Sequence, residues 1–494
     1  MGCAGDAPSD DSHPSSDPTL GAIQVQTLED LGWGDYTLTT WELGQTLDPP
    51  LRTKDGAAPR VHLFGPEAPR LGPPRPTLLW LHGGSLDKDS DEDPDGLVGY
   101  CADEHAQTTI LDAIDASPLL VFATMRGWAV VMPENTVCDG WAGEGADDPI
   151  DTTHHGAVLA RAAMALGQSS QLPWEPGVRY ITGTSLGAPA AVELALSGEF
   201  AGLAVDSGSA DEICFFADET CSPLPLTTRQ AWGEHVFGGV PTADGGGADT
   251  ALLTPSPQQD RYLQRSLIPM LQAGRISGPV VHIWSSGDNI SIPAQHEGVA
   301  VALRAALPEG TWVSLDMATV THSFFHRGPA PGAAWVTLRT FEGAEVTSYE
   351  LEGYDDEAWV GETQLRGDDQ PDSSGGAVRR SMPADGPGTL LVVDGLPDCR
   401  AGEPIEWLLL MRGADVEEER ILARVDVEQG GARRFRQDLT TTDLGSATTS
   451  NGPLRRWLEL ASGGFISQGG EGRLVIEVTG NGEVRADVLY WSCG

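Results

Sequence analysis

The stretch 179–196, RYITGTSLGAPAAVELAL, decides the fold of the first part of the chain. Residues 179–182 are mostly apolar or β-branched and predict a strand inside a sheet, whereas residues 186–196 are rich in Ala and Leu and predict a helix. The two are joined by Gly183-Thr-Ser185-Leu-Gly187, a Gly-x-Ser-x-Gly sequence. A strand that turns directly into a helix presents the serine hydroxyl at the end of the sheet, so Ser185 is a candidate nucleophile. An ordinary glycine-containing turn is the plainer alternative.

Similar strand patterns recur throughout residues 21–330. Continuous apolar runs alternate with segments of helical pattern, at 77–81, 128–132, 203–205, 280–284 and 312–315. Because such runs suit strands that are covered on both faces, they predict an α/β domain with a mostly parallel sheet flanked by helices. The earlier segments 36–41 and 60–64 are candidates for antiparallel edge strands.

A serine hydroxyl becomes a good nucleophile only when a base removes its proton. Asp288 follows one of the later apolar runs, and His322 follows the next. An acid at a strand end can orient a histidine, so the sequence predicts His322 as the base and Asp288 as its orienting acid. Asp206 is an alternative acid, and His326 is an alternative base.

A glycine-rich segment, His82-Gly83-Gly84-Ser85, comes directly after the run 77–81. Glycines let backbone N–H groups approach a substrate closely, which suits the stabilisation of an oxyanion. The predicted donors are the N–H of Leu186 and a second one near Gly84 or Ser85. His82 is expected to shape this loop.

Together these motifs resemble the α/β-hydrolase family of serine esterases, lipases and related peptidases. The resemblance covers about residues 21–329, and it implies the family's fold and an acyl-enzyme mechanism. Two departures stand out. The segment 207–278 is long and is expected to form a cap over the site, and the Pro-rich stretch after His322 lacks an obvious closing helix.

From residue 331 onward, short strand-like runs are separated by Gly, Asp and Ser clusters, at 335–339, 390–393, 407–410, 422–425, 474–478 and 484–488. This pattern predicts a second, all-β domain over 331–494, a β-sandwich. It resembles the galactose-binding-like or jelly-roll modules of secreted hydrolases. Binding of a carbohydrate or polymer surface and a purely structural role are both open, because sandwich folds do not dictate function.

Composition limits the possible partners. The 494 residues include 30 Lys and Arg against 72 Asp and Glu, a formal net charge of −42, which argues against nucleic acid as a partner. Two domains are the natural expectation for this length. No apolar run approaches the roughly 20 residues that span a bilayer.

The cysteines point to an oxidising compartment. Six of the seven allow three disulfides, for which the expected pairs are Cys101–Cys138, Cys214–Cys221 and Cys399–Cys493, among 15 possible pairings. The seventh, Cys3, lies in a polar segment, and Met1-Gly2-Cys3 resembles the start of a bacterial lipoprotein. Residues 1–20 are therefore expected to be a flexible tether with a lipid on Cys3; an unmodified cysteine in a disordered tail is the alternative.

The segment from Asp87 to Asp95 carries an acid at every second position, and Asp91-x-Asp93-x-Asp95-Gly96 matches half of a calcium-binding loop. Ala102 stands where the closing glutamate belongs, so a solvated acidic loop is the favoured interpretation, with calcium as the alternative. No other metal and no organic cofactor is expected.

The sequence thus predicts a serine hydrolase that cleaves carboxylic esters, secreted or anchored to an outer membrane. Small acyl esters, feruloyl-type esters and polyesters are candidate substrates. A serine peptidase of the prolyl-oligopeptidase type and a non-catalytic binding lipoprotein are the alternatives.

Overall fold

The computed structural model describes most of the predicted elements. The described residues are 24–28, 36–42, 60–66, 74–83, 118–134, 176–185, 187–208, 210–217, 220–222, 266–273, 276–286, 288, 290–316, 331–350, 362–365, 377–381, 385–413, 419–441, 460–482 and 484–494.

Within these residues, a nine-stranded mixed sheet has the order β1-β2-β3-β5-β4-β6-β7-β8-β9. Its strands are β1 Gln24–Leu28, β2 Tyr36–Glu42, β3 Arg60–Pro66, β4 Arg75–Leu81, β5 Ala129–Glu134, β6 Pro176–Thr184, β7 Leu203–Asp206, β8 Val280–Trp284 and β9 Trp312–Asp316. Strands β4 to β9 pair in parallel, whereas β1, β2 and β3 pair antiparallel at one side. The strands expected from the apolar runs of this region are confirmed.

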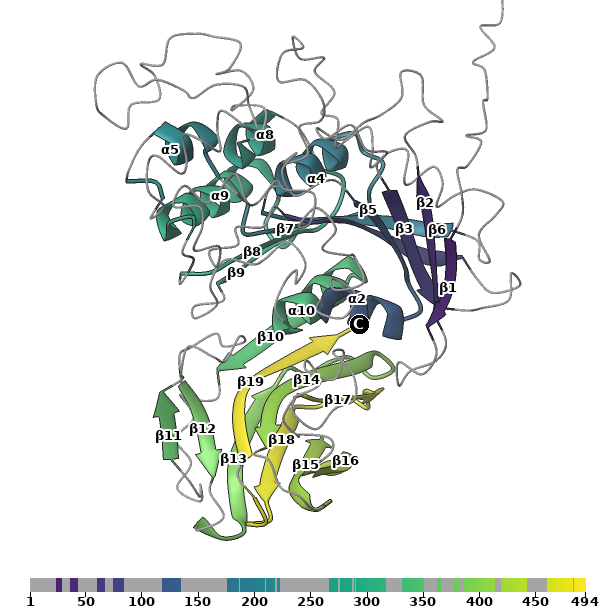
Figure 1. The fold of residues 1–494 in the computed structure, drawn as a ribbon. Helices are drawn as coiled ribbons and strands as arrows, with labels where there is room; N and C mark the ends of the chain where they lie inside the picture. The colour runs from purple at the N-terminus through teal and green to yellow at the C-terminus, as the bar shows by residue number, and fades with distance from the viewer. Residues whose placement is uncertain are drawn as a thin grey trace, which may run out of the picture.

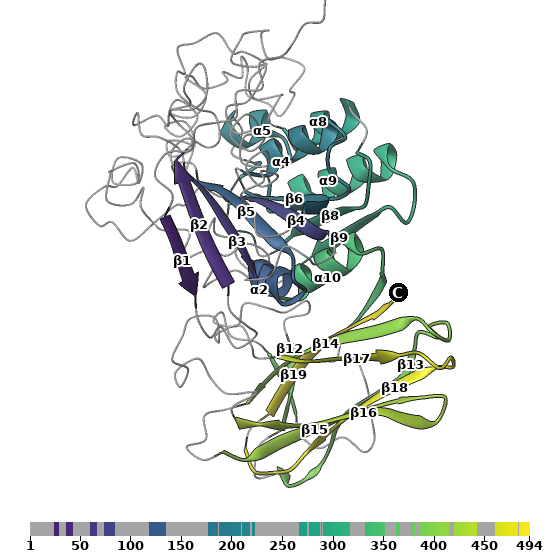
Figure 2. The same cartoon turned by 90° about the vertical axis from the view of Figure 1, so that its right-hand side faces the viewer.

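Helices cover both faces of this sheet (Figures 1 and 2). One face carries α4 Gly187–Leu196, α5 Glu212–Ala217, α8 Leu267–Ala273 and α9 Pro293–Ala306; the other carries α2 Pro118–Met125 and α10 Pro331–Phe341. Strand β4 shows why two layers form. Leu79 and Leu81 belong to the core under α4, while Leu78 and Trp80 belong to the core under α2 and α10. Side chains alternate between the faces of a strand, so a continuous apolar run needs cover on both sides.

Helix α10 corrects one expectation, because the predicted strand at 335–339 is wrong. The stretch begins with Pro331, which is favoured in the first turn of a helix, and continues with two alanines. Residues 333–339 are all buried, as expected of a helix that is covered on all sides. This tertiary cover outweighs the local β propensity of Trp335 and its neighbours.

The C-terminal strands form two antiparallel sheets, as the strand pattern predicted. One has the order β11-β12-β19-β14-β17, with β10 also paired to β19, and the other the order β13-β18-β15-β16. The strands are β10 Glu345–Glu350, β11 Glu362–Leu365, β12 Ala377–Ser381, β13 Gly388–Leu396, β14 Pro404–Gly413, β15 Ile421–Gln429, β16 Ala432–Thr440, β17 Leu460–Ile466, β18 Gly472–Val478 and β19 Val484–Cys493. The two sheets enclose a core of their own that includes Trp407 and Trp491.

Strand β14 joins this unit to the rest of the molecule. Trp407 and Leu409 lie in the core between the two C-terminal sheets, whereas Leu408 and Leu410 lie in the core that contains α10. The β14–β19 sheet is thus covered on both faces, with α10 between it and the nine-stranded sheet (Figure 1).

Ion pairs border the same junction. Arg126 after α2 pairs with Glu342 at 2.8 Å and with Glu406 of β14 at 2.5 Å. Arg339 of α10 is almost fully buried; it pairs with Glu342 and donates from Nε to Ser492 Oγ of β19 at 3.0 Å. Two buried or half-buried arginines therefore hold α2 and α10 against β14 and β19.

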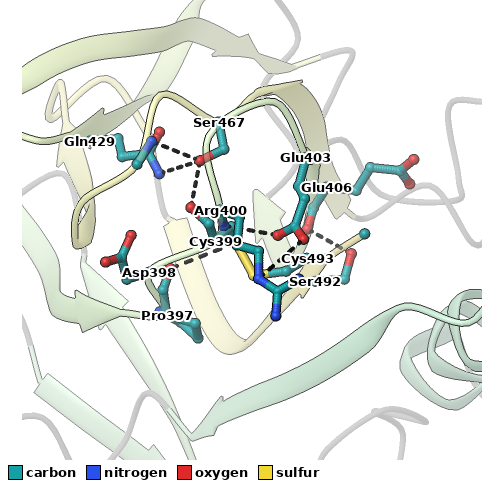
Figure 3. The surroundings of a disulfide bond; sticks show 12 residues. Pro397, Asp398, Cys399, Arg400, Glu403, Glu406, Gln429, Ser467, Ser492 and Cys493 are labelled. Carbon is teal, nitrogen blue, oxygen red and sulfur yellow. Dashed lines mark hydrogen bonds and ion pairs between the residues drawn. A yellow bond between two sulfur atoms is a disulfide. The ribbon is translucent and has the colours of Figure 1, made fainter.

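Two of the three predicted disulfides are confirmed. Cys214–Cys221 links α5 to the segment 220–222, and Cys399–Cys493 links the segment before β14 to the end of β19 (Figure 3). Beside the second one, Ser467 Oγ donates to the carbonyl oxygen of Cys399 at 2.7 Å and accepts from Nε2 of the buried Gln429 at 2.9 Å.

Several expectations fall outside the described residues. These are the tether 1–20 with Cys3, the pair Cys101–Cys138 and the acidic segment Asp87 to Asp95. The division at 330/331 and the cap at 207–278 stay predictions. In the described part of the chain, no group of three or more metal-ligating side chains gathers, and no helix has the length and apolarity to cross a bilayer.

Candidate active site

The turn after β6 has the strained geometry expected of a nucleophile. Ser185 adopts a φ of 50°, in the left-handed region that residues other than glycine rarely enter. Its N–H donates to the carbonyl oxygen of Asp206 at 2.7 Å, and its own carbonyl oxygen accepts from Ala188 of α4 at 3.0 Å. These two bonds, one to β7 and one to α4, hold the strained residue between strand and helix.

Both glycines of the motif are required by close packing. A Cβ on Gly183 would lie 2.4 Å from the carbonyl oxygen of Gly187, and a Cβ on Gly187 would lie 2.5 Å from the carbonyl oxygens of Leu81 and His82. No real Cβ contact is that short, so only glycine lets the helix begin against the end of β4. The Gly-x-Ser-x-Gly spacing therefore reflects the close approach of β6, α4 and β4.

The end of β4, which leads into the predicted oxyanion loop, meets this turn. The carbonyl oxygen of His82 lies against Gly187, and the buried His82 ring has Nδ1 2.8 Å from the carbonyl oxygen of Gly83. This contact accords with the expected role of His82 in shaping the loop. The three predicted oxyanion donors, Leu186, Gly84 and Ser85, lie outside the described residues.

The predicted acid, Asp288, lies after β8 with its side chain fully buried. Its Oδ1 accepts from the N–H groups of Ile290 at 2.7 Å and Ser291 at 3.0 Å, and its Oδ2 lies 3.3 Å from Nε2 of His296 on α9. Both carboxylate oxygens of Asp288 therefore have polar partners. The predicted base His322 and the alternative His326 are outside the described residues, so the pairing of either with Asp288 stays a prediction.

The alternative acid, Asp206, is fully buried at the end of β7, between the strands that lead to Ser185 and Asp288. Its Oδ1 accepts from the hydroxyl of Ser207 at 3.0 Å. Ser207 has a φ of 52° and is the second described non-glycine residue with positive φ. Adjacent strand ends thus carry two strained serines with Asp206 between them.

Sequence reasoning missed His296 and Ser207. His296 is fully buried, its ring lies 5.6 Å from that of Trp284, and a second buried histidine, His282 of β8, lies 5.9 Å away. Burial, and to a lesser degree the His296 ring, lowers the pKa of His282 from 6.5 to about 3. A histidine in the first turn of the helix after an acidic strand-end loop was the available signal for His296. For Ser207 it was the Asp-Ser-Gly sequence directly after a strand.

Comparison with known proteins gives weak structural likenesses only. No family model matches the chain, and no curated protein does. Among solved structures, esterase B from Lactobacillus rhamnosis has a TM-score of 0.39 and 14% identity over 65% of this chain and 85% of its own. The rice cell wall degrading esterase LipA from Xanthomonas oryzae has a TM-score of 0.39 and 16% identity over 65% of this chain and 95% of its own.

A puromycin-hydrolyzing peptidase from Mycobacterium tuberculosis has a TM-score of 0.37 and 16% identity over 66% of this chain. The match covers 46% of that peptidase, less than half of its length. TM-scores and identities this low do not assign an activity to this chain.

Proposed function

We propose that the chain is a serine hydrolase of α/β-hydrolase type that cleaves carboxylic esters through an acyl-enzyme. The observation that carries the proposal is the strained Ser185, held at φ 50° between β6 and α4 by glycines that no larger residue can replace without a clash. Strain of this kind persists only where surrounding structure maintains it, and it is common at reactive serines that follow a sheet strand.

The proposed mechanism uses a triad of nucleophile, acid and base, which are Ser185, Asp288 and His322 in chain order. His322 takes the proton of Ser185 Oγ while Oγ attacks the ester carbonyl carbon, and Asp288 holds the imidazole. The bond to the alcohol breaks as His322 returns the proton to the leaving oxygen. Water then attacks the acyl-enzyme, His322 takes its proton, and the acid leaves as the proton returns to Oγ.

The developing oxyanion would be stabilised by backbone N–H groups. The proposed donors are Leu186 and a residue near Gly84 or Ser85. The contact of Gly187 with the carbonyl oxygen of His82 supports this placement, because it brings the start of α4 and the end of β4 together.

The test is hydrolysis of p-nitrophenyl butyrate by the full chain and by Ser185→Ala. We expect kcat to fall at least about 10³-fold, since removal of a nucleophile leaves only the contribution of binding and oxyanion stabilisation. Ser207→Ala is a matched control, because Ser207 is equally strained and sits at the end of the neighbouring strand. We expect it to keep kcat within about threefold.

Hydrolysis that survives Ser185→Ala refutes this mechanism. A chain that turns over peptide p-nitroanilides in preference to esters supports the peptidase alternative. A chain that turns over neither, and that a fluorophosphonate fails to label at Ser185, supports the non-catalytic binding lipoprotein.

We also propose an extracytoplasmic location, supported by the two disulfides, which persist in oxidising compartments. A lipid on Cys3 and a carbohydrate or polymer surface for the C-terminal unit belong to the same proposal. Mass spectrometry of the N-terminal peptide from host membranes checks the lipid; an unmodified Cys3 there contradicts it.

A further inference from the structure

Both carboxylate oxygens of Asp288 have polar partners in its own loop or on α9. Oδ1 of Asp288 accepts two backbone N–H groups, and Oδ2 is approached by His296 Nε2 at 3.3 Å. A carboxylate oxygen only accepts, so the proton between them belongs to His296 Nε2. Each carboxylate oxygen can accept two hydrogen bonds, so one from His296 is compatible with a second from an imidazole on the substrate side.

The His296 ring is fixed in place. It is fully buried on α9, and the Trp284 ring stacks on it at 5.6 Å with an interplanar angle of 25°. The neighbouring Gln295 fixes the helix turn itself, because its Oε1 accepts the N–H groups of Ala210 and Asp211 and its Nε2 donates to the carbonyl oxygen of Cys221. An imidazole that stacks on Trp284 and is carried by a helix turn held by Gln295 has little freedom to follow the carboxylate, so it sets where Oδ2 lies.

Behind His296 lies a second imidazole. Trp284 Nε1, which only donates, lies 3.2 Å from Ser314 Oγ, and His282 Nδ1 lies 3.1 Å from the same oxygen. If the Ser314 hydroxyl accepts from Trp284 Nε1 and donates to His282 Nδ1, both contacts are hydrogen bonds, and the proton of the neutral His282 ring is on Nε2. His282 Nε2 and His296 Nδ1 are the two buried ring nitrogens here without a hydrogen-bond partner in the described part of the chain.

We propose that His296 is a positioning residue for the acid: its Nε2–H fixes Oδ2 of Asp288 from the side of α9. The inference rests on the proposed function, because it needs Asp288 to orient the base. It goes beyond that function by giving His296 the role of orienting the carboxylate that in turn orients the proposed base.

A matched pair of variants tests this placement. His296→Gln keeps an N–H near the position of Nε2, whereas His296→Met has nearly the same length and shape but no donor. A hydrogen bond to a buried charge accounts for roughly 10- to 100-fold in rate. We expect kcat for p-nitrophenyl butyrate to fall by that factor in His296→Met with KM unchanged, and to stay within about fivefold of wild type in His296→Gln.

If His296 has only a structural role, kcat should fall more in His296→Gln than in His296→Met. Buried Gln leaves its amide oxygen without a partner, so His296→Gln should be the less stable variant in urea, while Met packs well. Val299→Ala on the same helix is the control for loss of packing: Val299 is fully buried in the core, and its truncation should lower stability with kcat unchanged.

The outcomes separate the two proposals. Wild-type turnover that depends on Ser185, together with a kcat for His296→Met equal to that of His296→Gln, overturns the positioning role alone. Wild type without Ser185-dependent turnover overturns both proposals. If His296→Met does not fold, His296→Gln decides by itself, since a 100-fold loss of kcat in a folded His296→Gln overturns the role of the Nε2 donor.

Discussion

Replacement of Gly187 by alanine is the sharpest test of how the fold holds the nucleophile. The new Cβ would lie 2.5 Å from two backbone oxygens of β4, those of Leu81 and His82, whereas ordinary contact begins at 3.4 Å. Relief therefore requires about 0.9 Å of separation between the start of α4 and the end of β4. The φ of Gly187 is not positive, so the backbone conformation suits alanine and the clash acts alone.

Two effects follow from that displacement. Overpacking of this kind costs about 1–3 kcal/mol of folding free energy. Ser185 lies two residues before Gly187, and a misplacement of about 1 Å at reacting groups costs about 100-fold in rate. We therefore expect kcat/KM for p-nitrophenyl butyrate to fall by about two orders of magnitude in a protein that is still folded, with a urea midpoint below that of wild type.

Gly298→Ala on α9 is the matched control. There the new Cβ would meet the Cδ1 of Ile268 at 2.9 Å, the far end of a flexible side chain that can move. Alanine is favoured over glycine in a helix by up to about 1 kcal/mol, so stability should hold or rise and activity should not change. A Gly187→Ala protein that keeps kcat/KM within threefold of wild type would refute the view that this close approach positions Ser185.

Two further predictions concern the interior. Arg339→Met should lower the free energy of unfolding by about 2–4 kcal/mol, because the buried Ser492 hydroxyl and the Gly494 carbonyl oxygen lose a donor. Glu342 loses its pair with Arg339 and keeps its pair with Arg126. Urea unfolding measures the effect, and a loss below about 0.5 kcal/mol contradicts the prediction. His282→Asn should reduce the loss of stability on acidification. The pKa of His282 is near 6.5 in the unfolded chain and about 3 in the folded chain, so the unfolded chain binds a proton first. As pH falls between those values, this residue therefore lowers the free energy of unfolding by up to about 1.4 kcal/mol per pH unit. Thermal melts at pH 7, 5.5 and 4.5 compare the two proteins, and parallel losses would refute the prediction.

The strands and the serine turn could be predicted because their signals are local. A buried parallel strand has a continuous apolar sequence. The turn after β6 is encoded by five consecutive residues, two of them glycines with no room for a side chain. Asp288 was proposed as the acid on the same kind of local signal, since it lies in the loop after strand β8, and this role stays a prediction. Its surroundings could not be predicted, because the partner that approaches Oδ2 lies one helical turn into α9 and meets the carboxylate only after the chain folds back.

The prediction of a strand at 335–339 failed because a local propensity was weighed without its tertiary partner. Trp335, Val336 and Leu338 are all compatible with a strand, and residues 333–339 are buried against other layers without a break, so their burial has no period that marks a helix. Tyr180 of β6 shows one of those layers: its ring stacks on Phe341 at 4.7 Å, and its hydroxyl donates to the Phe341 carbonyl oxygen at 2.9 Å.

Helix α10 makes the C-terminal unit part of the support of the sheet that carries Ser185. It packs against β8 and against Tyr180 of β6, and it also contacts β14 and β19. Ser185 and the predicted acid Asp288 follow β6 and β8. Gly332 in this helix has no room for a side chain, because a Cβ would lie 2.2 Å from the hydroxyl of Tyr490 on β19. The continuous apolar run of β14 has the same origin as that of β4, since each strand needs apolar cover on two faces. A core shared in this way resists separation of the two units, because separation would expose Leu408, Leu410 and the covered face of α10 to water.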